Sequence, residues 1–258
     1  MSGRLYGVSL GPGDPGLITR RAWELLQRPA YWTYPVRNKK SDSYALGIVQ
    51  AAGLAPPEGH RPLVFPMTHD MELLAKSWLR AAQLVVEVLQ RGEDVMFLVE
   101  GDASTYSTFG HLARTVTSLD ESVQVETIAG VSSFHAAAAR LQMPLADVDD
   151  TVAIIPAGYG IPTIDHLLDN FDTLVLLKVK PLLDDIIQLL EQRGLLPHSA
   201  FIEKAGSSEE RVVHDVASLR NTTVNYLSLL LVKNPQRERG EMIRGCRKKS
   251  TTTEQEDS

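Results

Sequence analysis

Cysteine is almost absent from this chain of 258 residues, and the only one, Cys246, lies in a polar C-terminal stretch. A single cysteine excludes an internal disulfide and a cysteine-based zinc cluster, and it fits a reducing cytoplasm. No apolar run approaches the ~20 residues that a membrane-spanning helix needs, so we expect no membrane partner. The N-terminus starts a strand pattern at once, and we therefore expect no signal peptide and a cytoplasmic protein.

Motifs of two large functional classes are missing as well. No Gly-Lys-Ser/Thr follows a glycine-rich turn, which excludes a P-loop. The seven histidines include no His-x-x-x-His and no His-Glu-x-x-His pair. Because those spacings place two imidazoles on one helix face, their absence leads us to expect no protein-bound metal.

Positive charge is scarce overall, since the net charge of −6 argues against general nucleic-acid binding. The charge is uneven, however, because residues 20–40 carry six basic side chains against one acid, Glu24. Such a run is either a solvated surface or an attractor for a polyanionic substrate. On the second interpretation, the candidate substrate-binding residues are Arg37, Lys39 and Lys40.

Apolar strand-like runs alternate with helical patterns along most of the chain. Strands are expected at residues 4–10, 94–99, 123–128, 151–155, 173–178, 200–203 and 224–232. Helices are expected at residues 15–26, 71–91, 106–118, 132–141, 165–170 and 182–193. This alternation predicts an α/β protein in which each half has a mainly parallel or mixed sheet flanked by helices.

A short polar stretch near residue 120 suggests a boundary between two domains. We place the first domain at residues 1–119 and the second at residues 120–233. From residue 234 onward the sequence has clusters of charged residues and threonine without an apolar period. We therefore expect residues 234–258 to be a disordered tail.

Three short glycine turns follow apolar runs, at residues 10–14, 99–102 and 128–133, and are called the first, second and third turn. In open α/β sheets the ends of strands line the crevice that holds ligands. The three turns together therefore predict one composite pocket for a small polar molecule. Within the second turn, Asp102 is expected to cap the helix that follows.

These turns resemble the motifs of the tetrapyrrole methylase family, whose members methylate uroporphyrinogen- and precorrin-type macrocycles. The matching residues are Gly11-Pro12-Gly13-Asp14, Gly101-Asp102 and Gly130-Val131-Ser132-Ser133, and the resemblance extends over roughly residues 4–233. Within the family, residues 34–35, 43–46, 65–68, 106–109, 144–147, 154–157 and 226–230 resemble the C20-methyltransferases of precorrin-2 or cobalt-factor II.

The resemblance implies a two-domain fold with the active site in the cleft between the domains, and a homodimer. It implies S-adenosylmethionine as the cofactor, facing Pro12, Glu100, Gly101, Asp102, Thr105, Ser132, Ser133, Leu177, Ala205 and Gly206. The substrate would be a reduced tetrapyrrole, which the enzyme mainly aligns with the methyl donor. Tyr106 and His135 are the candidates for a base that removes the C20 proton, and packing roles stay open for both.

Two residues depart from the family motifs. Ser9 stands where glycine is usual, and Ala103 stands where proline is usual. We expect Ser9 to add bulk at the pocket floor and Ala103 to loosen a normally rigid turn. These two departures keep open a ligand-binding or regulatory module without turnover. Within the enzyme class, another tetrapyrrole methylase and a diphthine synthase that modifies a protein stay open as well.

Overall fold

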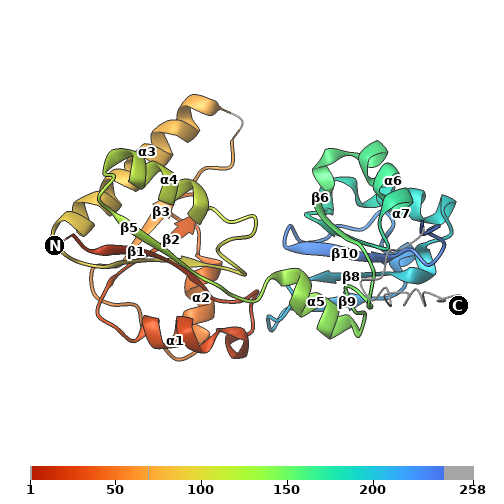
Figure 1. The fold of residues 1–258 in the computed structure, drawn as a ribbon, viewed down its shortest axis with the longest axis horizontal. Coiled ribbons are helices and arrows are strands. Elements are labelled where there is room, and N and C mark those ends of the chain that lie inside the picture. The colour runs from red at the N-terminus through yellow and green to blue at the C-terminus, as the bar shows by residue number, and fades with distance from the viewer. Residues whose placement is uncertain (1, 69, 241–258) are drawn as a thin grey trace, which may run out of the picture.

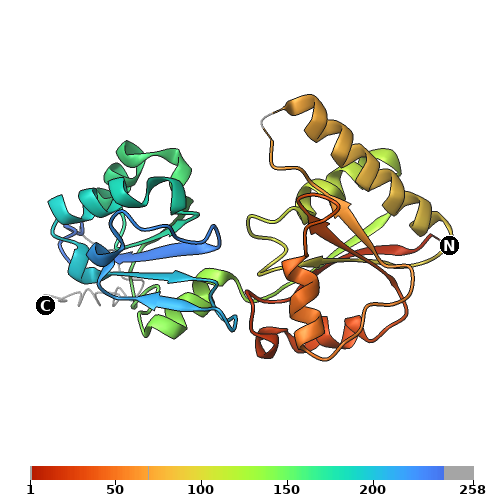
Figure 2. The same ribbon diagram turned by 180° about the vertical axis from the view of Figure 1, so that it is seen from behind.

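The computed structural model describes residues 2–68 and 70–240 and arranges them in two lobes, each built on a five-stranded sheet. Figures 1 and 2 show the lobes side by side, with loops of the first lobe extending toward the second. Helices flank both sheets. The expected two-domain α/β fold is thereby confirmed.

The first lobe contains an all-parallel sheet in the order β3-β2-β4-β1-β5. Its strands are β1 (Arg4–Ser9), β2 (Tyr31–Val36), β3 (Arg61–Val64), β4 (Val95–Val99) and β5 (Gln124–Ile128). Helices α1 (Arg20–Leu26) and α2 (Tyr44–Ala51) cover one face, and α3 (Met71–Gln90) and α4 (Phe109–Leu119) cover the other.

Strand β4 shows why this sheet is covered on both faces. All five of its side chains are buried, which is what a continuous apolar run in a parallel sheet requires. Phe97 packs with the core under α3 and α4, whereas Met96 and Leu98 pack with the core under α1 and α2. The central strand is thus fixed in register by apolar contacts on both sides.

The second lobe contains a mixed sheet in the order β6-β7-β10-β8-β9. Its strands are β6 (Val152–Pro156), β7 (Thr173–Leu177), β8 (Ser199–Glu203), β9 (Arg211–Val213) and β10 (Ser228–Lys233). Only β6 and β7 pair in parallel, and the other three pairings are antiparallel. Helices α6 (Ile161–Asn170) and α7 (Leu183–Gln192) cover one face, and α5 (Ser133–Leu141) covers the other.

The strand order of the first lobe creates a crevice between β1 and β4. The connection from β1 to β2 passes β4, and the connection from β4 to β5 passes β1 in the opposite direction. Ligands of open α/β sheets bind at such a reversal, outside the carboxyl ends of the strands. Gly11 and Gly101 lie just beyond these two ends, where the Gly101 N–H donates to the Gly11 carbonyl at 2.7 Å.

Several elements differ from the sequence expectations. Asp14 caps only a short 3₁₀ turn (Pro15–Leu17), and α1 begins after Thr19, whose hydroxyl accepts from the Ala22 N–H. Helix α4 begins at Phe109 instead of residue 106, because Tyr106 has a left-handed backbone with φ of 49°. β2, α2 and β3 were not expected at all; β2 contains Pro35, which weakens the local strand pattern.

The division between the lobes also differs from the expected boundary at residues 119 and 120. Strand β5 pairs with β1, so the first sheet continues to Ile128. At the other end, residues 234–240 are held against the second lobe, where Arg237 and Arg239 pair with Asp172. The remainder of the expected tail, residues 241–258, lies outside the described residues. No helix within the described part of the chain is long and apolar enough to cross a membrane.

Candidate functional site

A cavity of about 660 Å³ lies where the two lobes meet, and we call it the central cavity. Its first-lobe wall follows the ends of β1, β2 and β4, and its second-lobe wall is formed by the loops around β7, β8 and β10. All three turns contribute, since Pro12, Gly101 and Ser132 are among the lining residues. The turns therefore form one pocket, as the sequence predicted, and its volume suits a cofactor-sized molecule.

The central cavity brings together most of the residues that the sequence analysis assigned to a cofactor. Those that line it are Pro12, Glu100, Gly101, Asp102, Thr105, Ser132, Ser133, Leu177 and Ala205. Gly206 does not line the cavity but packs against the first turn, since a Cβ on it would lie 3.1 Å from N of Asp14 and 3.7 Å from Cγ of Pro12. Apolar side chains and exposed turn backbone thus face the same space, which fits a ligand with a flat apolar ring and a polar tail.

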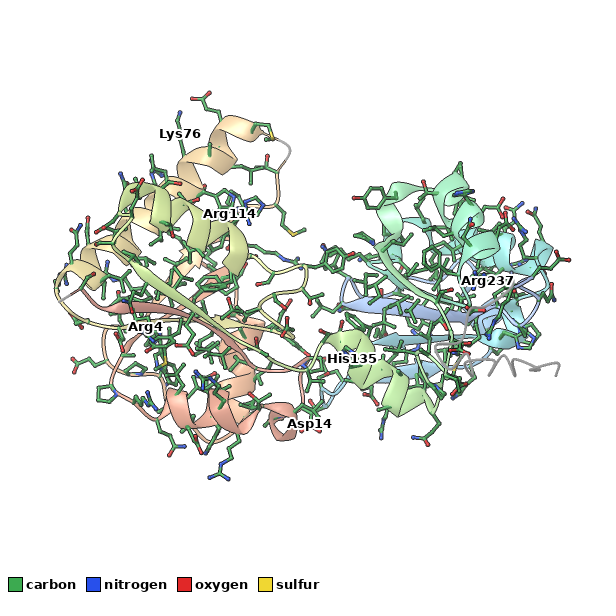
Figure 3. All side chains as sticks on the ribbon, viewed as in Figure 1. Arg4, Asp14, Lys76, Arg114, His135 and Arg237 are labelled. Atoms are coloured by element: carbon green, nitrogen blue, oxygen red, sulfur yellow. The ribbon has the colours of Figure 1, made fainter. Side chains whose placement is uncertain are left out.

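Only some of the candidate base and substrate residues lie at the central cavity. Tyr106 and Arg37 line the central cavity. His135 does not: it is an exposed residue of α5 near the junction of the lobes, as Figure 3 shows, and its ring contacts Phe134. Lys39 and Lys40 are exposed in the loop after β2 and do not line the cavity.

Asp102 joins the second turn to the third and does not cap α4, contrary to expectation. Its carboxylate accepts from the Gly130 N–H at 2.8 Å, from the Ser104 N–H at 2.8 Å and from the Thr105 hydroxyl at 3.2 Å. Burial alone would raise the pKa of Asp102, but these hydrogen bonds lower it below its ordinary value. The side chain is buried and remains ionised, so its role here is to hold the two turns together.

Ser9 and Ala103, the two departures from the family motifs, are hydrogen-bonded to each other. Neither has the effect that the sequence led us to expect. The Ala103 N–H donates to Oγ of Ser9 at 2.8 Å, and that hydroxyl donates to the Ile128 carbonyl. Ser9 is fully buried and lies outside the cavity lining, so it does not add bulk at the pocket floor. Ala103 is tied down and not loosened, through an N–H group that proline lacks.

Only glycine fits at residue 130, because the neighbouring turns leave no room there for a side chain. A Cβ on Gly130 would lie 2.3 Å from Cβ of Ser9 and 2.8 Å from the Gly101 carbonyl oxygen. No side chain fits at those distances without moving the backbone. The three turns are thus packed directly against one another, with glycine at the point of closest approach.

The first turn contains two short patterns that belong to other chemistries. Residues 7–11 read Gly-x-Ser-x-Gly, but Ser9 is fully buried and its hydroxyl is bonded as above, so it is no nucleophile. Residues 11–16 read Gly-x-Gly-x-x-Gly, but only the 3₁₀ turn follows them and α1 begins at Arg20. The helix N-terminus on which a dinucleotide pyrophosphate would sit is therefore missing there.

The second-lobe wall contains residues that the sequence analysis missed. Lys178 and Lys204 follow β7 and β8 directly, with left-handed φ values of 57° and 49°. Their N–H groups donate to the Ser228 and Leu227 carbonyls at 3.0 and 2.7 Å, which holds them beside the start of β10. Such a backbone costs non-glycine residues about 1–2 kcal/mol and is often retained at functional sites. In the sequence, the feature that could have identified these two residues is that each lysine directly follows an apolar run.

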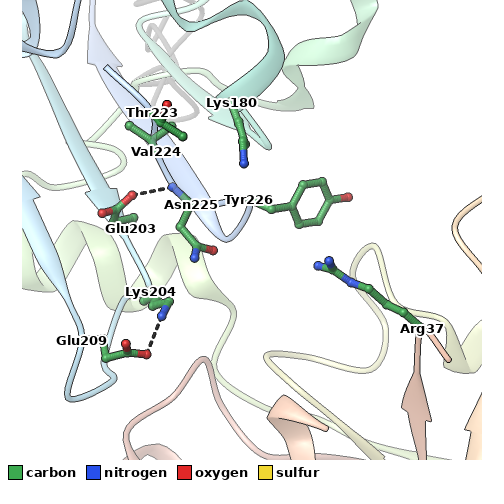
Figure 4. Close-up of a pocket in the computed structure, with 9 residues that line it drawn as sticks. All are labelled: Arg37, Lys180, Glu203, Lys204, Glu209, Thr223, Val224, Asn225 and Tyr226. Atoms are coloured by element: carbon green, nitrogen blue, oxygen red, sulfur yellow. Dashed lines mark hydrogen bonds and ion pairs between the residues drawn. The ribbon is translucent and has the colours of Figure 1, made fainter. Parts of the chain in front are cut away.

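Arg37 and Lys178 approach one ring from opposite lobes. The Arg37 guanidinium lies 5.8 Å and the Lys178 Nζ 5.9 Å from the centre of the Tyr226 ring. Figure 4 shows Arg37 pointing across toward Tyr226 and Lys180, at a second cavity of about 540 Å³, the side cavity. The two cavities at the junction of the lobes therefore gather four basic side chains, interspersed with acidic ones: Arg37, Lys178, Lys180 and Lys204.

Glu100 lies among these cations. Its side chain is exposed to the central cavity, which residues of both lobes line. Desolvation by the surrounding protein raises the pKa of the Glu100 carboxyl, and the positive charges of Arg37 and Lys178 oppose the rise. No group of three or more His, Cys, Asp or Glu residues with metal-binding geometry occurs in the described ranges.

Comparisons with known proteins agree with this geometry. The family model of the tetrapyrrole (corrin/porphyrin) methylases matches residues 4–219. Cobalt-precorrin-2 C(20)-methyltransferase of Salmonella typhimurium is 34% identical over 93% of this chain and 100% of its own length. The probable cobalt-precorrin-2 C(20)-methyltransferase of Methanocaldococcus jannaschii is 30% identical over 91% of this chain and 97% of its own.

A solved structure is similar as well. Uroporphyrin-III C-methyl transferase of Thermus thermophilus, complexed with S-adenyl homocysteine, is 25% identical, with a TM-score of 0.59. The similarity covers 90% of this chain and 97% of that one. The family match includes all three turns and reaches into both lobes. This chain therefore belongs to the tetrapyrrole methylases.

Proposed function

We propose that this protein transfers a methyl group from S-adenosylmethionine to C20 of cobalt-precorrin-2, a step of cobalamin biosynthesis. The observation that carries the proposal is the meeting of three turns in one cavity, in a chain whose relatives are named for this reaction. The relatives' names favour the cobalt form of the substrate, and metal-free precorrin-2 is the second acceptor to test.

The cofactor, in this proposal, lies against eight of the nine predicted residues that line the central cavity, all except Glu100, and Gly206 packs against the first turn beside them. Leu177 and Ala205 offer apolar surface for the adenine ring, and the Ser132 and Ser133 region offers polar groups for the charged tail. When bound, S-adenosylmethionine supplies an electrophilic methyl group. The protein then has to align it with the acceptor carbon, an effect worth ~7–11 kcal/mol.

The carboxylates of the macrocycle, in the same proposal, bind the cations at the junction of the lobes. Arg37 belongs to the predicted set, and Lys178 and Lys204 join it because they line the same cavity. Lys39 and Lys40 lie farther along the exposed loop, and we assign them at most attraction at long range. Two lobes thus contribute charge to one substrate.

The test is a reaction of purified protein with S-adenosylmethionine and either cobalt-precorrin-2 or precorrin-2. We expect mass spectrometry to detect one added methyl group and carbon-13 labelling from the methyl donor to place it at C20. A methyl group at another position would assign the chain to a sibling methylase. Cofactor binding without any methyl transfer to either acceptor would favour a binding module.

The assembly and compartment are part of the proposal, supported by the family resemblance. We propose a homodimer in the cytoplasm. Light scattering on the purified 28.4 kDa chain is expected to give twice that mass. A monomeric mass at micromolar concentration would contradict the dimer without touching the assignment of the reaction.

A further inference from the structure

One carboxylate in the central cavity is not engaged by the protein. Three carboxylates line this cavity, those of Asp42, Glu100 and Asp102. Asp102 is saturated by hydrogen bonds within the turns, and Asp42 is exposed in the loop before α2. Among the described residues, the Glu100 side chain has neither a hydrogen bond nor an ion pair. A carboxylate that lines the cavity without a protein partner is free to meet a bound ligand, and such groups are candidates for a functional role.

Glu100 lies at the strand ends where the first and second turns meet. It is the first residue after β4 and directly precedes Gly101, at the crevice between β1 and β4. Arg37, from the first lobe, and Lys178, from the second, act on it electrostatically from both sides. The walls shared by both lobes therefore surround this one side chain.

The other titratable groups that face the cavity are Arg37, Asp42, Tyr44, Asp102, Tyr106, Lys178, Lys204 and Tyr226. Three of them, Tyr106, Tyr44 and Asp102, are poorly suited to accept a proton. The Tyr106 hydroxyl donates to the Ile154 carbonyl at 2.8 Å. Burial raises the pKa of the Tyr44 phenol, which keeps it protonated. The lowered pKa of Asp102 makes it a weak base.

We propose that Glu100 is the general base that removes the C20 proton, an inference that rests on the proposed function. The electron pair of C20 forms the bond to the methyl carbon while the methyl–sulfur bond breaks toward sulfur, which leaves as S-adenosylhomocysteine. C20 then carries both a methyl group and a hydrogen. The Glu100 carboxylate takes that hydrogen as a proton, and the electron pair of the C–H bond returns to the macrocycle.

The surroundings of Glu100 suit this task. A general base is most effective when its pKa lies near the operating pH, and burial moves the pKa of Glu100 in that direction. The positive charges of Arg37 and Lys178 oppose the rise and so favour the ionised form. After the reaction the cavity is open enough for the proton to pass to water. Positioned proton transfer typically contributes about 100- to 10,000-fold in rate.

The central experiment replaces the carboxylate by an amide of the same shape, in Glu100→Gln. We expect kcat to fall at least about 100-fold, whereas the affinity for S-adenosylmethionine, measured by calorimetry, changes less than about threefold. The matched control is Asp42→Asn, which removes a carboxylate from the rim of the same cavity and is expected to keep kcat within about twofold.

Two further measurements separate proton removal from a structural role. Because the ionised form is the base, wild-type kcat falls as pH drops through the Glu100 pKa, and Glu100→Gln lacks this acidic limb. An acceptor deuterated at C20 is expected to show a larger isotope effect in Glu100→Gln than in wild type. Infrared titration of the ligand-free protein adds a readout without turnover: one carboxyl band that titrates above the ordinary glutamate range is expected to vanish in the variant.

The outcomes distinguish this proposal from the one on which it rests. Wild-type protein that methylates C20, together with undiminished kcat in Glu100→Gln, overturns the role of Glu100 alone. Loss of S-adenosylmethionine affinity with normal kcat at saturation also overturns it and makes Glu100 a cofactor ligand. Wild-type protein that does not methylate C20 overturns both.

Discussion

The two walls of the central cavity are built differently. The first-lobe wall includes short turns joined by hydrogen bonds between distant residues, such as Asp102 to Gly130 and Ala103 to Ser9. The second-lobe wall includes Lys178, Lys204 and Tyr226, which follow or precede strands of a mixed sheet. Cross-linked turns thus distinguish the first wall, and two lysines at strand ends distinguish the second.

Sheet topology explains this difference. In the all-parallel first sheet the carboxyl ends of neighbouring strands β1 and β4 lie together, so their turns touch and cross-link. In the second sheet β10 runs between β7 and β8 in the opposite direction, which separates the ends of those two strands. The first arrangement gives a rigid frame, and the second leaves room for side chains. We infer that the frame places the methyl donor and the cations choose the acceptor.

The largest expected effect comes from breaking the frame at Gly101. Gly101 has φ of 73° and open space around its missing Cβ, so Gly101→Val strains the backbone and fills the cavity. We expect kcat/KM to fall at least about 100-fold, because small displacements misalign the reacting groups. Thermal unfolding is expected to show a modest loss of about 1–2 kcal/mol.

Gly53 provides the matched control for Gly101. It has a similar φ of 85° and open space, but it lies after α2 and does not line the central cavity. Gly53→Val is expected to lose a similar amount of stability and to retain its activity. Equal losses of activity in the two variants would refute the assignment of the second turn to the site.

A smaller effect, on the free energy of unfolding, is expected when the hydrogen bond between Ser9 and Ala103 is removed. Ser9→Gly leaves the buried Ala103 N–H without its acceptor, at a cost of about 1–3 kcal/mol. Ala103→Pro removes the N–H group from Oγ of Ser9. Because each substitution removes the same hydrogen bond, the double variant is expected to lose about 1 kcal/mol less than the sum. Urea unfolding measures the four stabilities, and strict additivity would show that the two departures are unrelated.

The charged wall is tested by Lys178→Ala. We expect KM for the acceptor to rise about tenfold at low salt, and less at high salt, since exposed charges are screened. The affinity for S-adenosylmethionine is expected to stay unchanged in calorimetry. Lys40→Ala is the control, because Lys40 has the same charge but lies outside the cavity lining. A larger rise in KM in Lys40→Ala than in Lys178→Ala would instead indicate that the loop after β2 binds the substrate.

The smallest effect on activity is expected from Asp172→Asn in the second lobe. This substitution is expected to change stability instead. Burial would raise its pKa, but hydrogen bonds from Thr151 and Arg239 and the charge of Arg237 lower the pKa to about 2. A carboxylate with a lowered pKa stabilises the fold above its ordinary pKa. That contribution is lost as pH falls from about 4 to about 2. At neutral pH the methylation rate is expected to be unchanged by Asp172→Asn.

Tryptophan fluorescence can show whether the loss of stability at low pH is confined to the second lobe. All three tryptophans, Trp23, Trp32 and Trp78, belong to the first lobe. We therefore expect acid to change circular dichroism before it changes tryptophan fluorescence, and Asp172→Asn to remove that difference. Asp169→Asn, in an exposed pair with Arg193, is the control. Coincident transitions in wild-type protein would show that the lobes unfold together.

The sequence predicted the turns because their signal is local. A glycine between an apolar run and a polar residue marks the end of a strand wherever that strand lies in the sheet. The same logic located β1, β4 and β5 to within two residues. Short elements such as β3 escaped because four residues do not establish a period.

The contacts that join the turns were not predictable in this way. Ser9 and Ala103 are separated by 94 residues, and Asp102 and Gly130 by 28. Read alone, Ser9 was excess bulk, Ala103 a loosened turn and Asp102 a helix cap. Each assignment was reasonable for its own segment and wrong in the assembled protein, because the hydrogen-bonding partner came from another strand.

Order along the chain and local chemistry were decided by the sequence: the alternation of strands and helices, the three turns, and the membership of a methylase family. Which strand lies beside which was decided only by the tertiary structure, since each sheet face must be buried against helices that come from elsewhere in the chain. That choice put β4 next to β1, brought Lys178 toward Arg37, and left Glu100 between them as an unpaired carboxylate. Burial and long-range pairing, which no local pattern encodes, made one cavity out of separate strand ends.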